Sequence, residues 1–153
     1  NKLSTLKSSL WMALVLTAAT GLAACGSAPS EPASQAAVQG AVAKDVKVAE
    51  FQELMAREGA LLLDVRSDGE WAEGHLEGAA YIPFASADFN QQLAALPKDR
   101  PVLVYCASGG RSAKAMQALN AAGHPEVYNL LGGIRAWQGA GNPVVHTEPV
   151  QIQ

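Results

Sequence analysis

Short apolar runs alternate with amphipathic segments from residue 46 almost to the end of the chain. Continuous apolar runs of this kind are typical of strands that a parallel sheet buries on both faces. They occupy residues 60–65, where Asp64 is the one acid, and 101–105, and further short strands are predicted at 46–48, 79–82 and 127–130. Apolar residues recur at helical spacing in 49–57, 89–96, 112–122 and 134–138. This alternation predicts one α/β domain with a mostly parallel central sheet and helices on both faces.

Two kinds of local signal mark where the helices begin and end. Ser67 and Glu70 have the spacing of a capping box, which predicts a short helix carrying Trp71. Gly59 and Gly123 each follow a helical pattern and are natural C-terminal caps. These signals predict helices that end at Gly59 and Gly123 and a short helix that begins after Ser67.

The chemistry of the chain centres on Cys106, which directly follows the apolar run 101–105. The residues after it are Ala107, Ser108, Gly109, Gly110, Arg111 and Ser112. The order of strand, glycine loop and helix places the thiol where backbone N–H groups and a positive dipole end converge. Such surroundings lower a cysteine pKa from ~8.5 to roughly 3.5–7.5. The pattern favours sulfur chemistry on an anionic substrate over the alternative, a small buried hydrophobic residue at a strand end.

The first 24 residues read as a targeting segment. Lys2 and Lys7 form a positive start, and the apolar stretch that follows is short for a membrane span. Residues 22–25, Leu-Ala-Ala-Cys, resemble a bacterial lipobox, which implies a signal peptide removed at residue 24 and a Cys25 that carries palmitate and other acyl chains. Several chains suffice for stable anchoring. The alternative is an ordinary secretory signal cut after Ala24.

The remaining divisions of the chain follow from composition. Gly26 after the cysteine resembles the outer-membrane pattern of lipoproteins, so we expect a lipid anchor in a bacterial membrane, the outer membrane facing the periplasm. Residues 25–43 hold the lipidated cysteine and a flexible tether rich in Ala, Ser, Pro and Gln. The folded domain is expected at 44–147, and 148–153 form a C-terminal tail.

Charge and cysteine content exclude several classes of function. Without residues 1–24, nine basic side chains face 14 acidic ones, a net charge of −5, and no basic stripe indicates a nucleic-acid partner. No cluster of His and Cys has the spacing of a metal site, and no second glycine motif suggests a nucleotide. With Cys25 committed to lipid, Cys106 has no partner within the chain for a disulfide.

Three segments together resemble single-domain rhodaneses. Residues 62–66 (LLDVR), followed by Glu70-Trp71 and 74–79 (GHLEGA), are similar to the first signature of that family. Residues 106–112 resemble its active-site loop, and 132–137 (GGIRAW) with 141–144 (GNPV) are similar to its closing signature. The resemblance covers nearly all of the folded part and occurs in the family's order.

The resemblance implies sulfur transfer without a cofactor or metal. Cys106 would take the outer sulfur of thiosulfate or a related donor as a persulfide and pass it to a thiophilic acceptor. Backbone N–H groups from Ala107 to Arg111, with Gly109 and Gly110 allowing the close approach, would surround the sulfur. The Arg111 guanidinium is expected to face the substrate. Ser112 is expected first to cap the following helix and second to contact the substrate.

Other polar residues of the signatures receive structural interpretations. Asp64 and Arg66 lie two apart on a strand, project to one side and predict a polar network rather than catalytic groups. His75 is expected to be structural, and Trp71 and Trp137 to anchor the core.

Two alternative functions stay open beside sulfurtransferase activity. One is a persulfide carrier or binding module for a protein partner. The other is a phosphatase, since related phosphatases use a Cys…Arg loop. That loop is one residue longer than the loop from Cys106 to Arg111, which favours sulfur here.

Overall fold

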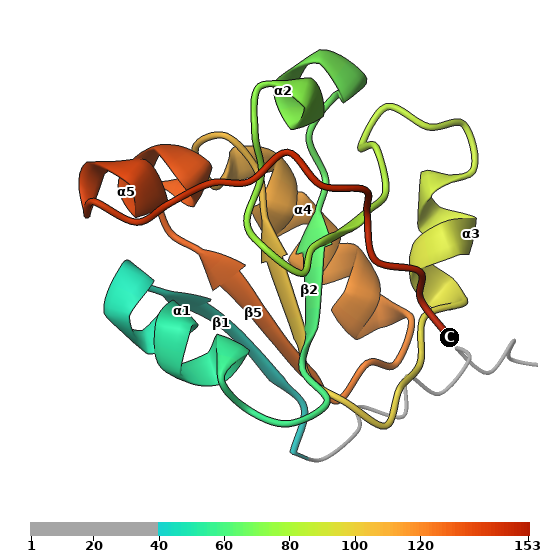
Figure 1. Ribbon diagram of the computed structural model, residues 1–153. Coiled ribbons are helices and arrows are strands. Elements are labelled where there is room, and N and C mark those ends of the chain that lie inside the picture. Colours follow the sequence, from blue (N-terminus) through green and yellow to red (C-terminus); the bar gives the residue numbers. More distant parts are fainter. Residues whose placement is uncertain (1–39) are drawn as a thin grey trace, which may run out of the picture. The chain divides into compact units, whose positions relative to one another are not determined.

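A five-stranded, all-parallel sheet forms the centre of the domain in the computed structural model, which describes residues 40–153 (Figure 1). The strands are β1 (Val42–Val46), β2 (Leu61–Asp64), β3 (Ala80–Tyr81), β4 (Val102–Tyr105) and β5 (Glu126–Leu130), in the order β1-β5-β4-β2-β3. The parallel sheet predicted from the apolar runs is confirmed. Because all strands point the same way, their carboxyl ends lie at one edge of the domain.

Helices cover both faces of this sheet, as predicted. On one face, α3 (Phe89–Ala94) and α4 (Gly110–Ala121) bury a cluster that includes Leu93 and Leu119. On the other face, α1 (Val48–Met55) and α5 (Gly133–Gly139) bury Phe51 and Trp137. The short helix α2 (Asp68–Ala72) follows β2, and the predicted capping box between Ser67 and Glu70 is present.

Strand β4 explains why its sequence shows no alternation. All four of its residues are buried, with Val102 and Val104 in the cluster under α3 and α4. Leu103 and Tyr105 belong to the opposite cluster. Full burial of a Val or Leu side chain stabilises a fold by about 1.5–3 kcal/mol. Cys106 follows this strand directly, so a well-packed element holds the loop that it opens.

The start of the domain differs from the prediction. Of the predicted short strand at 46–48, only Val46 belongs to a strand: it is the last residue of β1, and Val48 begins α1. β1 begins at Val42, so residues 42 and 43, which the composition assigns to the tether, belong to the sheet. Only Val46 of this strand is buried. An edge strand with exposed side chains carries no apolar run, which is why the sequence pattern misses it.

The segment after α5 lies against the domain rather than projecting from it. Figure 1 shows it passing α2 and ending beside α3. The backbones of His75 and Val145 pair in an antiparallel bridge, and the Val150 N–H donates to the carbonyl of Ala79 at 3.0 Å. Ile152 packs on the cluster under α3. The predicted tail at 148–153 therefore contributes to the packing of the described residues.

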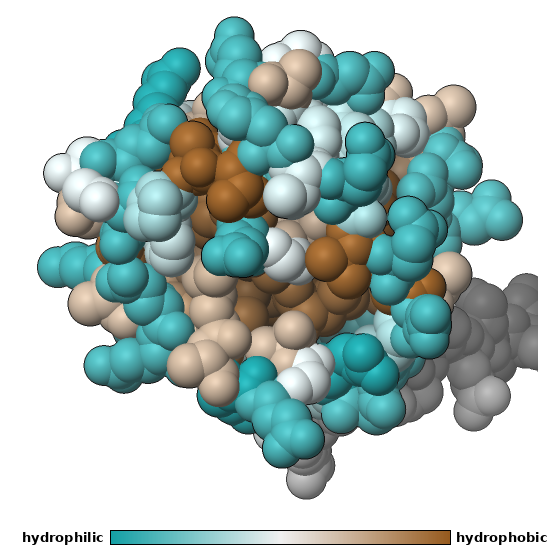
Figure 2. Space-filling view, viewed as in Figure 1, coloured by the Kyte–Doolittle hydropathy of each residue, from teal (hydrophilic) through white to brown (hydrophobic). Residues whose placement is uncertain are grey.

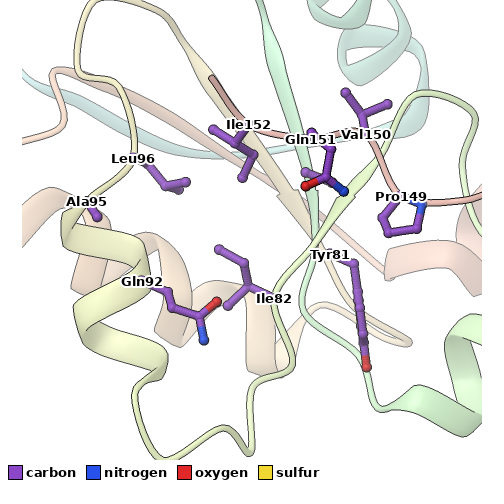
Figure 3. Close-up of a pocket in the computed structure, with 10 residues that line it drawn as sticks. Tyr81, Ile82, Gln92, Ala95, Leu96, Pro149, Val150, Gln151 and Ile152 are labelled. Carbon is purple, nitrogen blue, oxygen red and sulfur yellow. The ribbon is translucent and has the colours of Figure 1, made fainter.

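This segment closes one side of a cavity of about 350 Å³. Figure 3 shows Pro149 to Ile152 on one side, Gln92 of α3 with Ala95 and Leu96 just after it on another, and Tyr81 and Ile82 from the β3 region. Cys106 and its loop do not line it. The surface seen in Figure 2 is largely hydrophilic, with apolar residues in small and partly recessed areas.

The predicted polar network of Asp64 and Arg66 is confirmed as a buried ion pair. The Arg66 side chain donates to the Asp64 carboxylate at 2.7–3.1 Å, and its Nη2 also donates to the carbonyl of Gly74 at 2.8 Å. The exposed fractions of the two side chains are 4% and 0%. Pairing and hydrogen bonds offset the cost of burying the charges.

Two features of the N-terminal segment lie outside the described residues, namely the signal peptide at 1–24 and Cys25 with most of the tether. Among residues 40–153, no helix has both the length and the apolar character required to cross a membrane.

Candidate active site

The loop after β4, hereafter the Cys106 loop (residues 106–111), turns the chain directly into α4. Gly109 makes the turn with a φ of 99°, a left-handed conformation that glycine adopts without steric cost. This lets the helix start at Gly110, two residues before the predicted start at 112. The prediction that Ser112 caps the helix is therefore wrong: Gly109 is the N-cap residue, and Ser112 lies within the first turn.

The Cys106 thiol is enclosed by hydrogen-bond donors of this loop. The Gly109 N–H donates to Sγ at 3.1 Å, and the Ser112 hydroxyl donates at 3.3 Å. Only 1% of the residue is exposed. Burial raises the pKa of the thiol, but the Ser112 hydroxyl and the N–H groups of Ser112, Ser108 and Gly109 outweigh it, so the pKa is lowered overall. The loop therefore favours the thiolate, the nucleophilic form.

The start of α5 determines which way the loop's peptide groups point. The Ile134 N–H donates to the carbonyl of Cys106 at 2.8 Å, and the Arg135 N–H donates to that of Ala107 at 3.3 Å. These carbonyls are held by α5, away from the sulfur. Gly133 makes the approach possible, because a Cβ there would lie 2.6 Å from the carbonyl carbon of Ala107. The sequence assigns Gly133 only to a family signature and does not predict this packing.

A second support reaches the loop from beneath. The Asn129 side-chain amide, at the end of β5, donates to the carbonyl of Gly109 at 3.3 Å and to the Asp45 carboxylate at 2.7 Å. The carbonyl of Gly109 also accepts the Ala113 N–H at 3.0 Å, which begins the helical hydrogen bonds of α4. Through these two hydrogen bonds the buried Asn129 side chain connects strands β1 and β5 to the turn that positions the Gly109 N–H.

Arg111 has a partner that the sequence does not predict. Its guanidinium donates to both oxygens of Glu70, with Nη1 to Oε2 at 2.7 Å and Nη2 to Oε1 at 2.6 Å. Arg111 lowers the pKa of Glu70 to about 2, against the effect of burial and together with hydrogen bonds from Ser67. Glu70, predicted only as part of a capping box, also ties α2 to the Cys106 loop.

A smaller cavity of about 240 Å³ lies between α2, the Cys106 loop and α5. Ala107 lines it from the loop, with Glu70 and Glu73 on one side and Ile134 and Arg135 on the other. Cys106 itself does not line this cavity, but Ala107, the next residue of the loop, does, and the lining is more charged than that of the larger cavity.

His75 has the structural surroundings that the sequence predicts for it. It is buried, its ring stacks on Trp71 with centroids 3.5 Å apart, and its nitrogens contact the carbonyl of Trp71 and the hydroxyl of Thr147. Trp137 is buried in the core and Trp71 is partly buried against it. None of the contacts of His75 involves Cys106, so activation of the thiol rests on the loop.

Within residues 40–153, Cys106 is a free cysteine, and no group of three potential metal ligands comes together. Residues 47–140 match the model of the rhodanese-like domain. The chain belongs to the rhodanese-like domain family. The segment that matches contains β2 to β5, the Cys106 loop and α5, so the match includes the whole candidate site.

Relatives with sulfurtransferase names share this rhodanese-like domain. A "Sulfurtransferase" of Allochromatium vinosum is 39% identical over 97 residues, which cover 63% of this chain and 89% of the relative. "Thiosulfate sulfurtransferase GlpE" of Coxiella burnetii is 33% identical over 95 residues, 62% of this chain and 87% of the relative. A "Probable adenylyltransferase/sulfurtransferase MoeZ" of Mycobacterium tuberculosis is 43% identical over 76 residues, half of this chain but only 19% of that longer protein.

Solved structures agree with the fold. A rhodanese-related protein from Thermoplasma volcanium is 30% identical, with a TM-score of 0.60, covering 68% of this chain and 99% of that one. A rhodanese-like domain protein from Staphylococcus aureus is 29% identical, with a TM-score of 0.58 and coverage of 69% and 99%. The sulfurtransferase names of the relatives support membership in a sulfurtransferase family.

Proposed function

We propose that this rhodanese-like domain is a sulfurtransferase that carries sulfane sulfur as a persulfide on Cys106. The observation that carries the proposal is the enclosed thiol, whose sulfur accepts the Gly109 N–H at 3.1 Å and the Ser112 hydroxyl at 3.3 Å. These donors face a sulfur anion both before and after transfer, and they need not reorganise during the reaction. The sulfurtransferase names of the relatives support the same reading.

The proposed reaction has two displacements at sulfur. The Cys106 thiolate attacks the outer sulfur of a donor such as thiosulfate, the S–S bond of the donor breaks, and sulfite leaves with the bonding electron pair. The product is a Cys106 persulfide anion. A thiophilic acceptor, for example cyanide or a thiol, then attacks the outer sulfur, and the Cys106 thiolate leaves. No redox cofactor or metal takes part in these steps.

Each loop residue has a proposed part in binding. Gly109 and Gly110 allow the backbone to approach the sulfur closely. Ser108 and Ser112 supply donors that lower the pKa of Cys106. Ala107 lines the cavity where the donor's leaving group is accommodated. Arg111 interacts with the Cys106 thiol and contributes positive charge that its pairing with Glu70 partly offsets.

Loading with sulfur tests the proposal. Incubation of the full chain with thiosulfate should add the mass of one sulfur atom and release one equivalent of sulfite, and cyanide should reverse the addition. Cys106→Ser should do neither. Cys25→Ala is the matched control, because it removes the other cysteine of the chain and should load like the wild type. Sulfur transfer by the Cys106→Ser variant would overturn the mechanism.

Phosphate ester hydrolysis tests the alternative function, a phosphatase. Four residues separate Cys106 from Arg111, a short loop for a tetrahedral phosphate. Hydrolysis of an aryl phosphate should be negligible beside sulfur transfer. Robust hydrolysis that disappeared in Cys106→Ser would favour a phosphatase instead.

The proposal includes a lipid anchor at Cys25, which rests on the lipobox-like residues 22–25. We propose that the domain is held at a bacterial membrane, on the periplasmic side of the outer membrane. Expression of the full chain in a Gram-negative host should give a membrane fraction whose protein carries lipid-dependent mass, and Cys25→Ala should abolish both. Wild-type protein found wholly in the soluble periplasmic fraction would contradict the anchor.

A further inference from the structure

The guanidinium of Arg111, which a doubly charged sulfur donor would need, is already paired with the carboxylate of Glu70. Both terminal nitrogens of Arg111 donate to Glu70, at 2.6 and 2.7 Å. Oε2 of Glu70 also accepts the Ser67 N–H at 3.0 Å and the Ser67 hydroxyl at 2.7 Å. Paired, capped and ionised at neutral pH, this carboxylate is fixed at the mouth of the Cys106 loop. A bidentate pair with further hydrogen bonds is stronger than an ordinary surface pair.

The other charges around the mouth also cancel. The charge of Arg66 is offset by Asp64 in the buried pair. Glu73 and Arg135 line the same cavity with opposite charges. The charged residues that line this cavity are therefore two arginines, Arg66 and Arg135, and two acidic residues, Glu70 and Glu73, so this side of the mouth has no net formal charge. A neutral mouth gives little electrostatic attraction to a dianion, and Glu70 repels one at close range.

We propose, on the basis of the proposed function, that Glu70 sets the class of sulfur donor and selects organic persulfides over thiosulfate. Thiosulfate carries two negative charges, and its sulfonate end matches the planar fork of an arginine that is free to bind it. Here that fork is occupied. An organic persulfide that reacts in its protonated form, R–S–SH, brings an uncharged outer sulfur to the thiolate and needs no second cation.

The transfer from such a donor balances within the loop. The Cys106 thiolate attacks the protonated outer sulfur, the S–S bond of R–S–SH breaks, and the thiolate R–S⁻ leaves with the electron pair. Cys106 is left as a protonated persulfide, and the single negative charge has moved to the leaving thiol. The backbone N–H groups that stabilise Cys106 are enough for one charge. Glu70 touches none of the reacting atoms, so it is a specificity-determining residue rather than a catalytic one.

Glu70→Gln is the variant that isolates the charge. Gln serves in a capping box as Glu does, so α2 keeps its cap. The matched control is Glu126→Gln, which removes the same charge from another bidentate pair, that of Glu126 with Arg57. Glu126 begins β5 and therefore lies at the opposite end of the parallel strands from the Cys106 loop.

The measurement is kcat/KM of the full chain with thiosulfate and with 2-hydroxyethyl persulfide, whose organic group is uncharged, each with cyanide as acceptor. The wild type should favour the persulfide. Glu70→Gln should raise kcat/KM for thiosulfate roughly tenfold, mainly through KM, and less at high salt. The value for the persulfide should change by less than about twofold, as should both values in Glu126→Gln. The double variant Glu70→Gln with Arg111→Gln should lose the gain.

Several results would overturn the inference. These are a wild-type preference for thiosulfate, an equal effect of Glu70→Gln on both donors, and a similar gain in Glu126→Gln. Urea unfolding of each variant identifies any loss of fold. Glu70→Asp separates the charge from the stability of the fold, because its shorter side chain retains the negative charge. If Glu70→Gln is destabilised, Glu70→Asp should still show no gain in kcat/KM for thiosulfate. Failure of the proposed function is distinct, because neither donor would then load Cys106.

Discussion

Substitution of Gly133 by alanine tests whether the close packing of α5 positions the Cys106 loop. Gly133 is the first residue of α5 and has a φ of 58°. A Cβ built there meets the Cys106 carbonyl oxygen and lies 2.6 Å and 2.7 Å from the carbonyl carbon and oxygen of Ala107. All three contacts are with backbone, which cannot turn away as a side chain would. Either α5 or the loop must move.

The size of the effect follows from two contributions. A left-handed conformation costs an alanine about 1–2 kcal/mol relative to glycine. Overpacking against a buried segment costs about 1–3 kcal/mol. Gly133→Ala should therefore lower the free energy of unfolding by roughly 2–5 kcal/mol, a large part of the ~5–15 kcal/mol typical of a small domain. Displacement of the loop should also weaken the N–H contacts of Cys106 and reduce sulfur transfer at least tenfold.

Urea unfolding followed by tryptophan fluorescence measures the first effect, and the rate of thiol alkylation against pH measures the second. Gly139→Ala is the matched control, because Gly139 is the last residue of the same helix, and a Cβ there meets nothing within 4 Å. It should change stability by less than about 1 kcal/mol, in the stabilising direction. Wild-type stability and wild-type alkylation in Gly133→Ala would refute the account of the loop.

Three further predictions concern individual side chains. Ser112→Ala should raise the pKa of Cys106, seen as an alkylation profile shifted to higher pH, because the hydroxyl is one of the groups that lower it; an unchanged profile would contradict this. Asp64→Asn leaves the buried Arg66 charge unpaired and should cost about 3–5 kcal/mol in urea unfolding, whereas Asp99→Asn, in a surface pair whose carboxylate is 76% exposed, should cost less than about 1 kcal/mol. Burial lowers the pKa of His124, whose Nε2 contacts the carbonyl of Leu93, so the unfolded chain takes up protons more readily. Stability should therefore fall as pH drops through about 6.5 towards the lower pKa of the folded state, and His124→Gln should flatten this slope in urea midpoints measured against pH.

The sequence predicts those parts of the fold that local pattern determines. Strands β2 and β4 are largely apolar runs because both of their faces are covered, and the cap at Ser67 depends on residues only three apart. β1 escapes detection because an exposed edge strand is recognised by its register with β5, from Val42 opposite Glu126 to Val46 opposite Leu130, and not by apolar residues.

In the candidate site too, the sequence predicts the features that depend on neighbouring residues and misses those that depend on packing. The position of Cys106 at the end of β4 follows from the local order of strand, loop and helix. The start of α4 is mispredicted because the left-handed turn at Gly109 replaces the side-chain cap expected from Ser112. The partner of Arg111 lies 41 residues earlier, and the donor to the carbonyl of Cys106 lies 28 residues later at Ile134. Contacts at such separations depend on how the elements pack, which spacing along the chain does not encode.

Under the proposed persulfide mechanism, the near-complete burial of Cys106 has a consequence for the order of the two half-reactions. Only 1% of the residue is exposed while it carries no sulfur. An S–S bond is about 2 Å long, so a sulfur carried on Cys106 would extend that far beyond the thiol sulfur. The outer sulfur of the persulfide would then be more accessible than the Sγ atom of Cys106. A bulky acceptor would therefore not reach Cys106 before it carries sulfur and would react only with the persulfide. The burial of the thiol would in this way fix the order in which donor and acceptor react, without a conformational change.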